Sequence, residues 1–236
     1  MSCIGLHTTD ERTDMNTLLN GSLHGEEAAS PSAGVAPGII PEAKSSQTGV
    51  SVEYVESPDK EWYVFRASYS RETKAADDLI RANVYAYVPK RKEMVERDGR
   101  RKKVLKSLIP NIVFAYTDAP SAHLMVKESS ILSFYYNHFE TNGMGRNLPL
   151  TISNKEMLNF IRATSTQSPH LKQVISAKCR YLDDKIVEII KGDYKGVVGR
   201  VARIAGQQCV VVSLANGEFR ISTDYIPTPF FRVVEG

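Results

Sequence analysis

The sequence is poor in cysteine and has no long apolar run. Its three cysteines, Cys3, Cys179 and Cys209, form no Cys-x-x-Cys pair, which argues against a disulfide framework and against a zinc site. No apolar stretch approaches the roughly 20 residues that cross a bilayer. Residues 1–30 also lack a basic start followed by an apolar core, as a secretory signal would have. We therefore expect a cytoplasmic protein with free thiols.

Signatures of catalysis are missing as well. The five histidines are scattered, and none stands at ligand spacing from a cysteine or carboxylate. The adjacent pairs Asp77-Asp78 and Asp183-Asp184 point in different directions on a helix or strand and cannot share a substrate. No hydrolase, metalloprotease or Rossmann fingerprint is present. The sequence predicts a protein without enzymatic activity, metal or cofactor.

Positive charge is concentrated in one segment, although the whole chain has a net charge of only +3. Residues 90–106 hold nine lysines and arginines against three acidic residues. The Asp98-Gly99 dipeptide in this segment is a strong hairpin signal, so we expect an exposed basic β-ribbon. Residues 1–58 are instead acidic and rich in small residues, which predicts a largely disordered leader with a strand-like alternation at 50–55.

The rest of the chain divides into two patterned blocks. Residues 59–163 alternate strand and helix patterns, which indicates an antiparallel sheet flanked by helices. Residues 164–178 read as a linker, and 179–236 hold five short strand patterns, as in a small β-barrel. The chain should therefore be an α+β protein. The expected first-block elements are strands at 62–67, 84–88, 111–116 and 131–136, and helices at 70–83 (capped by Ser70), 119–129 and 153–163 (capped by Ser153). The expected strands of the second block are 185–190, 197–204, 209–214, 219–223 and 231–234.

The second block resembles a KOW domain. Residues 188–201 have an apolar strand, the spacing Gly-x-x-x-Gly-x-x-Gly and then Arg-Val. Glycines at these positions permit sharp backbone bends between the strands of a tiny SH3-like barrel, so their role is first of all structural. We assign to the motif Lys191, Gly192, Tyr194, Lys195, Gly196 and Gly199. Together with Arg203, the lysines and the tyrosine offer a weak contact for RNA or protein. Because this block is rich in valine, isoleucine and turn glycines, we expect strands and no helical form.

The first block resembles the N-terminal domain of the NusG family. Three segments carry the resemblance, which spans about residues 60–236: Trp62-Tyr63-Val64, Val88-Pro89 and Leu108-Ile109-Pro110-Asn111-Ile112-Val113-Phe114. Pro-Asn in place of Pro-Gly, together with the long leader, is closer to the specialised RfaH and UpxY paralogues than to housekeeping NusG.

The resemblance implies a transcription elongation or antitermination factor. Such a factor binds the clamp helices of RNA polymerase through an apolar sheet surface, and the matching positions are Tyr63, Pro110, Ile112 and Phe114. Core packing is the alternative role of these residues. The resemblance also implies processive transcription of specific operons, such as polysaccharide loci, and contact of the KOW domain with a ribosomal protein or termination factor.

Basic residues near the two ends of the first sheet offer a contact for upstream DNA or the non-template strand, because cationic surfaces bind phosphate regardless of sequence. They are Arg71, Lys74, Lys90, Arg91 and Lys92. A solvated charged ribbon is the alternative. A different function class also remains open, since KOW barrels occur in ribosome-associated RNA-binding proteins. A much stronger basic balance than +3 would be expected there.

Overall fold

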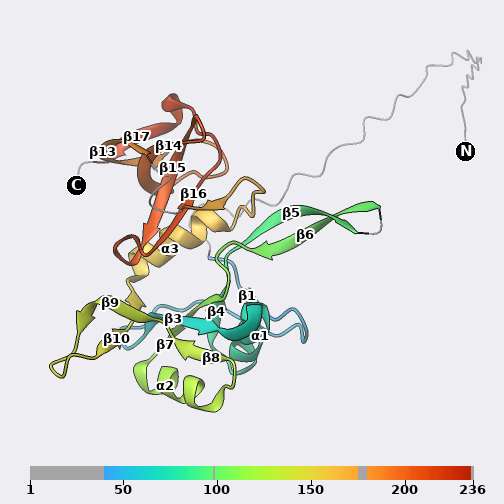
Figure 1. Cartoon of the computed structure of the whole chain (residues 1–236), viewed down its shortest axis with the longest axis vertical. Coiled ribbons are helices and arrows are strands. Elements are labelled where there is room, and N and C mark those ends of the chain that lie inside the picture. Colours follow the sequence, from blue (N-terminus) through green and yellow to red (C-terminus); the bar gives the residue numbers. More distant parts are fainter. Residues whose placement is uncertain (1–39, 98, 175–179, 235–236) are drawn as a thin grey trace, which may run out of the picture. The chain divides into compact units, whose positions relative to one another are not determined.

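The computed structural model describes residues 40–97, 99–174 and 180–234, all within one compact unit of the chain, Ala33–Gly236 (Figure 1). The helices are α1 (Glu72–Arg81), α2 (Ala119–Glu128) and α3 (Asn154–Thr164). The strands up to α3 are β1 (Ala43–Lys44), β2 (Ser51–Val52), β3 (Glu61–Ala67), β4 (Tyr85–Tyr87), β5 (Lys90–Arg97), β6 (Arg100–Ser107), β7 (Ile112–Thr117), β8 (Leu132–Phe134), β9 (Tyr136–Thr141), β10 (Asn147–Pro149) and β11 (Thr151–Ile152).

The first block folds into a five-stranded antiparallel sheet. Its order is β11-β3-β7-β4, and β8 pairs with the far end of β3. The predicted middle strand is confirmed, because β7 lies between β3 and β4 and all six of its residues are buried. The strand expected at 131–136 is interrupted at Tyr135, and β9 pairs with β10 in a separate hairpin. The fold of this block is the expected antiparallel sheet with helices.

Different helices cover the two sides of this sheet. On one side Phe65 contacts Phe134, with ring centroids 5.5 Å apart, and Phe134 contacts His123 of α2. On the other side Phe114 contacts Phe160 of α3 at 5.7 Å. The side chain of Ser153 caps α3 by accepting from the Glu156 amide, as its sequence predicts.

The second block forms an open sheet instead of the expected five-stranded barrel. Its strands are β12 (Lys172–Gln173), β13 (Arg180–Ile189), β14 (Val198–Ile204), β15 (Gln207–Leu214), β16 (Phe219–Ser222) and β17 (Phe231–Val234). They pair in the order β12-β16-β15-β14-β13-β17, and among the described residues no ladder joins β12 to β17. The sixth strand, β12, comes from the segment expected to be a linker, because it pairs with the edge of β16. The described residues of this block contain strands and short 3-10 turns, in line with the expected absence of a helical form.

The basic segment forms the expected β-ribbon. Strands β5 and β6 pair without interruption from Lys90↔Ser107 to Arg97↔Arg100, and Figure 1 shows them as a two-stranded arm. Met94 and Leu105 are exposed on this arm, although both are apolar. The ribbon therefore holds its cations away from the core.

Residues 40–58 are ordered, although the sequence suggested a disordered leader up to residue 58. The alternation at 50–55 produces β2, which pairs with β1. The ring of Tyr54 stacks on Trp62 at 5.7 Å, and the amide of Ser46 donates to the buried carboxylate of Asp77 at 2.7 Å. This segment is ordered because Tyr54 packs against aromatic residues of the sheet, and composition alone does not reveal this contact. Residues 1–39 lie outside the described part of the chain.

Candidate functional site

The four predicted polymerase contacts do not lie on one surface. Strand register places Phe114 opposite Val64 and Tyr63 opposite Ala115, so Tyr63 and Phe114 point to opposite sides of the sheet. Tyr63 stacks with Phe65, at 6.4 Å, on the side that α2 covers. Ile112 shares the side of Phe114, which we call the Phe114 face. The structure therefore places Ile112 on the same side of the sheet as Phe114 and places Tyr63 on the other side.

Pro110 and Ile112 lie at the open end of the Phe114 face. Both line a hollow of about 480 Å³ on the protein surface. Pro110 is exposed, whereas Ile112 is only 4% exposed. Pro110 is therefore the one predicted polymerase contact whose side chain is exposed in this structure.

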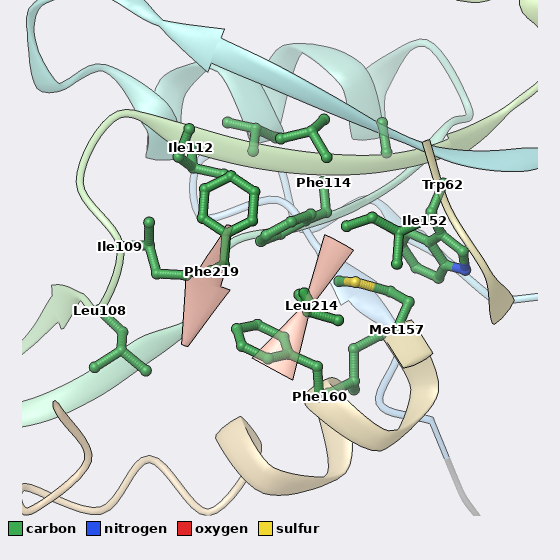
Figure 2. Close-up of a cluster of buried hydrophobic side chains, with 14 of the residues drawn as sticks. Trp62, Leu108, Ile109, Ile112, Phe114, Ile152, Met157, Phe160, Leu214 and Phe219 are labelled. Atoms are coloured by element: carbon green, nitrogen blue, oxygen red, sulfur yellow. The ribbon is translucent and has the colours of Figure 1, made fainter. Parts of the chain in front are cut away.

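The chain's own C-terminal sheet covers the Phe114 face. The Phe219 ring of β16 meets the Phe114 ring edge-on, with centroids 5.9 Å apart. Figure 2 shows Phe219 and Leu214 opposite Ile112 and Phe114, with Phe160 of α3 beside them. Phe114 and Leu214 have no exposed surface. A partner can therefore reach Phe114 only after Phe219 and Leu214 have moved away.

The apolar contact of Phe219 and Leu214 with Ile112 and Phe114 is called the seam below. Polar contacts surround it. The side chain of Asn159 in α3 donates to the carbonyl of Val198 and accepts from its amide, both at 2.8 Å. Arg162, one turn further along α3, donates to the carbonyl of Gly196 at 2.8 Å. Tyr135 donates its hydroxyl to the carboxylate of Glu218. The seam thus pairs two side chains of α3 with backbone groups of Val198 and Gly196.

The glycines of the predicted KOW motif have structural roles, as the sequence analysis expected. Gly192 and Gly196 both adopt φ +82°, a conformation that favours glycine. A Cβ atom at Gly199 would lie 2.4 Å from the carbonyl oxygen of Val211, so β14 and β15 can approach only without a side chain there. These positions therefore shape the sheet.

Tyr194 is not available as a surface aromatic. It is 4% exposed, and desolvation by burial raises the pKa of its hydroxyl to about 12. Lys191 and Lys195 on either side of it are exposed. The expected combination of cations with an aromatic is therefore reduced to the two lysines and Arg203, which is also exposed.

The predicted nucleic-acid contacts form two groups. Arg71 and Lys74 are exposed at the start of α1. Lys90, Arg91 and Lys92 begin the ribbon, where alternation points Arg91 to the face opposite Lys90 and Lys92. No hydrogen bond or ion pair links the two groups in the part of the chain that the structure describes.

Arg91 is already engaged within the protein. It donates to the carbonyl of Leu171 at 3.1 Å and forms an ion pair of 2.9 Å with Glu93. Hydrogen bonds from Lys106 and then Arg91 hold the pKa of Glu93 below its usual value. Lys90 and Lys92 carry no such ion pair among the described residues, so they are the available cations at the base of the ribbon.

Tyr69 is a surface residue that sequence reasoning missed. It lies in a 3-10 turn (Ser68–Ser70) between β3 and α1, and its side chain is 86% exposed. The predicted cap at Ser70 is wrong. Its amide donates to the Asn111 side chain, its φ is +53°, and the N-cap position of α1 is Arg71 without a side-chain cap. A tyrosine followed by two polar residues before a helix gave no local signal for this geometry.

The fold joins an α/β domain with a five-stranded sheet to a six-stranded C-terminal sheet. Residues 60–161 match the family described as transcription termination factor NusG. The match begins at β3 and ends in α3, so it includes Ile112, Phe114 and the ribbon. This block is therefore similar to NusG, and we call it the NusG-like domain; members of that family are non-enzymatic transcription factors that generally bind RNA polymerase. No curated protein matches the chain.

Within the described residues, no group of three His, Cys, Asp or Glu side chains stands close enough to hold a metal ion. No described helix is long and apolar enough to cross a membrane. The similarity of residues 60–161 to NusG suggests a role in transcription elongation or termination.

Proposed function

We propose that this protein is a transcription elongation and antitermination factor that binds the clamp helices of RNA polymerase through its Phe114 face. The observation that carries the proposal is the position of this face within the NusG-like residues 60–161. Ile112 and Phe114 offer a continuous apolar surface there, the kind of surface that an amphipathic helix pair can bury. Binding, without catalysis, is the mechanism.

Polymerase binding through this face requires a change in the protein itself. Phe219 and Leu214 cover Phe114 (Figure 2), so a clamp helix that binds this face has to displace them. The polymerase must therefore compete with the C-terminal sheet for the same apolar residues. The apparent affinity for polymerase then equals the intrinsic affinity multiplied by the fraction of molecules in which the face is open.

The remaining surfaces have secondary roles in the proposal. Arg71, Lys74, Lys90 and Lys92 contact upstream DNA or the non-template strand through phosphate, which requires no sequence readout. Once released, the C-terminal sheet is free to contact a ribosomal protein or a termination factor. Specificity for particular operons, including polysaccharide loci, follows the analogy with the RfaH and UpxY paralogues.

The test is capture of purified bacterial RNA polymerase by the full chain. Pro110→Glu places a charge at the accessible end of the Phe114 face without disturbing a buried side chain, and it should reduce capture at least tenfold (~1.4 kcal/mol). Leu124→Glu is the matched control, because Leu124 is 53% exposed on α2 beyond the opposite side of the sheet. Circular dichroism checks that both variants fold.

The capture experiment also separates this proposal from the other function class. Equal capture by wild type and Pro110→Glu would show that the Phe114 face is not used. No capture of polymerase by the wild type, together with binding to ribosomes, would favour a ribosome-associated KOW protein.

A further inference from the structure

The ribbon of β5 and β6 carries two exposed apolar side chains on one of its faces. Lys92 pairs with Leu105 and Met94 pairs with Lys103, and paired residues point to the same side of an antiparallel ladder. Met94 and Leu105 are therefore diagonal neighbours, with exposed fractions of 54% and 53%. We call this side of the ribbon the Met94 face, and the two apolar side chains its apolar patch. Single apolar residues are normal on a surface, but two neighbours on a thin arm form a patch that the fold leaves uncovered.

Cations surround the apolar patch. Lys92, Arg101 and Lys103 share the Met94 face and are exposed, and Glu96 is the only carboxylate among the paired residues on that side. None of the three cations forms an ion pair in the part of the chain that the structure describes. On the opposite face, Glu93 neutralises two cations. The Met94 face is thus the side of the ribbon with unpaired positive charge.

This combination of side chains fits a partner that is acidic and apolar at once. The phosphates of a nucleic acid would neutralise the cations but would leave Met94 and Leu105 in water. A purely apolar partner would bury the patch and take water from unpaired charges, which costs free energy. A peptide with carboxylates beside apolar residues satisfies both groups. A two-stranded ribbon is itself marginally stable in water, so it also gains from having its free face covered.

The chain's own sequence contains a segment with this chemistry. Residues 10–19 hold three carboxylates against one arginine, and three apolar residues follow the last carboxylate, namely Met15, Leu18 and Leu19. These residues lie outside the described part of the chain. Their charge is opposite to that of the Met94 face, and their apolar residues match its patch.

The segment is tethered close to the base of the ribbon. The carbonyl of Pro41 accepts from the Tyr85 hydroxyl at 2.6 Å, and only two residues separate β4, which holds Tyr85, from the start of β5. A ribbon of eight residue pairs is about 26 Å long. The 21 residues between Leu19 and Pro41 can span up to about 70 Å. Residues 10–19 can therefore reach the whole ribbon, and the tether makes the encounter intramolecular.

We propose that residues 10–19 dock on the Met94 face of the same chain, with their carboxylates at the three cations and their apolar residues over the apolar patch. The inference goes beyond the proposed function and does not depend on whether the protein binds polymerase. Its consequence is regulation of the ribbon. While the segment is docked, Lys92 is occupied, so a nucleic acid that binds this face has to displace an acidic peptide first.

The experiment cross-links carboxylates to lysines in the full chain with a carbodiimide and maps the products by mass spectrometry. The carboxylates of residues 10–19 should link to Lys92 and Lys103 about tenfold more often than to Lys155, an exposed lysine of α3. Salt should reduce these links, because the Debye length falls from about 10 Å at 0.1 M to about 3 Å at 1 M. A mixture of isotopically light and heavy protein shows whether the links form within one chain.

Variants that keep every lysine test the two parts of the contact. Met94→Gln/Leu105→Gln removes the apolar patch and should lower the yield of these links about threefold or more. Arg101→Gln removes one cation and should lower the yield as well. Val55→Gln and Arg146→Gln are the matched controls, because both residues are exposed and lie outside the ribbon, and they should link like the wild type. Circular dichroism checks that each variant folds.

Three outcomes would overturn the inference. The first is equal linking of residues 10–19 to Lys155 and to the ribbon lysines, or an unchanged yield in Met94→Gln/Leu105→Gln. The second is links that form only between light and heavy protein, which would place a second copy of the chain on the Met94 face. The third is a ribbon that binds a labelled DNA duplex in an anisotropy titration but shows no link to residues 10–19, which would assign the face to nucleic acid alone.

Discussion

The ring of Phe219 in the C-terminal sheet meets the ring of Phe114 in the NusG-like sheet edge-on, with an interplanar angle of 84°. Edge-to-face packing at 5.9 Å is a favourable aromatic geometry, and both side chains are buried. The residue expected to meet the polymerase is thus already paired inside the protein. In the proposed function, binding of the polymerase requires this pair to separate.

Removal of the polar contacts of Asn159 should loosen the seam. Asn159→Ala leaves the amide and carbonyl of Val198 without their side-chain partner, at a cost of about 1–3 kcal/mol. We expect the C-terminal sheet to dissociate more often from α3. Limited proteolysis between α3 and β13 should then proceed faster than in the wild type.

Lys155→Ala is the control for that experiment, because Lys155 is exposed on the same helix. It should be cleaved at the wild-type rate. Identical cleavage of all three proteins would mean that the hydrogen bonds of Asn159 do not hold the seam.

A side chain at Gly199 should destabilise the C-terminal sheet. The Cβ atom of Gly199→Ala would collide with the backbone of Val211 at 2.4 Å, and a backbone atom cannot move aside cheaply. Overpacking of this kind costs about 1–3 kcal/mol or more. Thermal denaturation should show a lower midpoint for Gly199→Ala. Gly143→Ala, which meets nothing within 4 Å, should keep the wild-type midpoint, and equal midpoints for both variants would contradict this account of the motif.

Stability should fall at alkaline pH. Burial raises the pKa of Tyr194 from 10 to about 12. The stability that the protonated Tyr194 hydroxyl contributes is therefore fully present below pH 10 and is lost as the pH rises to about 12. Tyr194→Phe cannot ionise, and its unfolding free energy should therefore fall less over this window, by roughly 2–3 kcal/mol. Urea titrations at pH 9 and pH 11.5 measure the difference. Parallel pH profiles for the two proteins would show that Tyr194 ionises freely in the folded state.

Local patterns in the sequence predicted most of the elements. Alternation and apolar runs identified β3 and β7, and the Asp-Gly dipeptide identified the ribbon. These features depend on neighbouring residues alone. The capping residue Ser153 was also predicted correctly, because its role is set within one helical turn.

The arrangement of the candidate site depends on partners distant in sequence. Tyr63 was grouped with Phe114 because both stand at positions that match the NusG family, but only the register of β3 against β7 reveals that they face opposite ways. The covering of Phe114 by Phe219 joins residues more than one hundred positions apart, and no local pattern encodes it. The order of residues 40–58 depends in the same way on Tyr54 meeting Trp62.

The most direct test of the account is the affinity of purified bacterial RNA polymerase for the wild type and for Phe219→Ala. Loss of the Phe219 ring removes the contact with Phe114 and exposes the face, so Phe219→Ala should bind about tenfold or more tightly, provided circular dichroism shows both domains folded. Equal or weaker binding by folded Phe219→Ala would contradict the claim that polymerase and the C-terminal sheet compete for the Phe114 face.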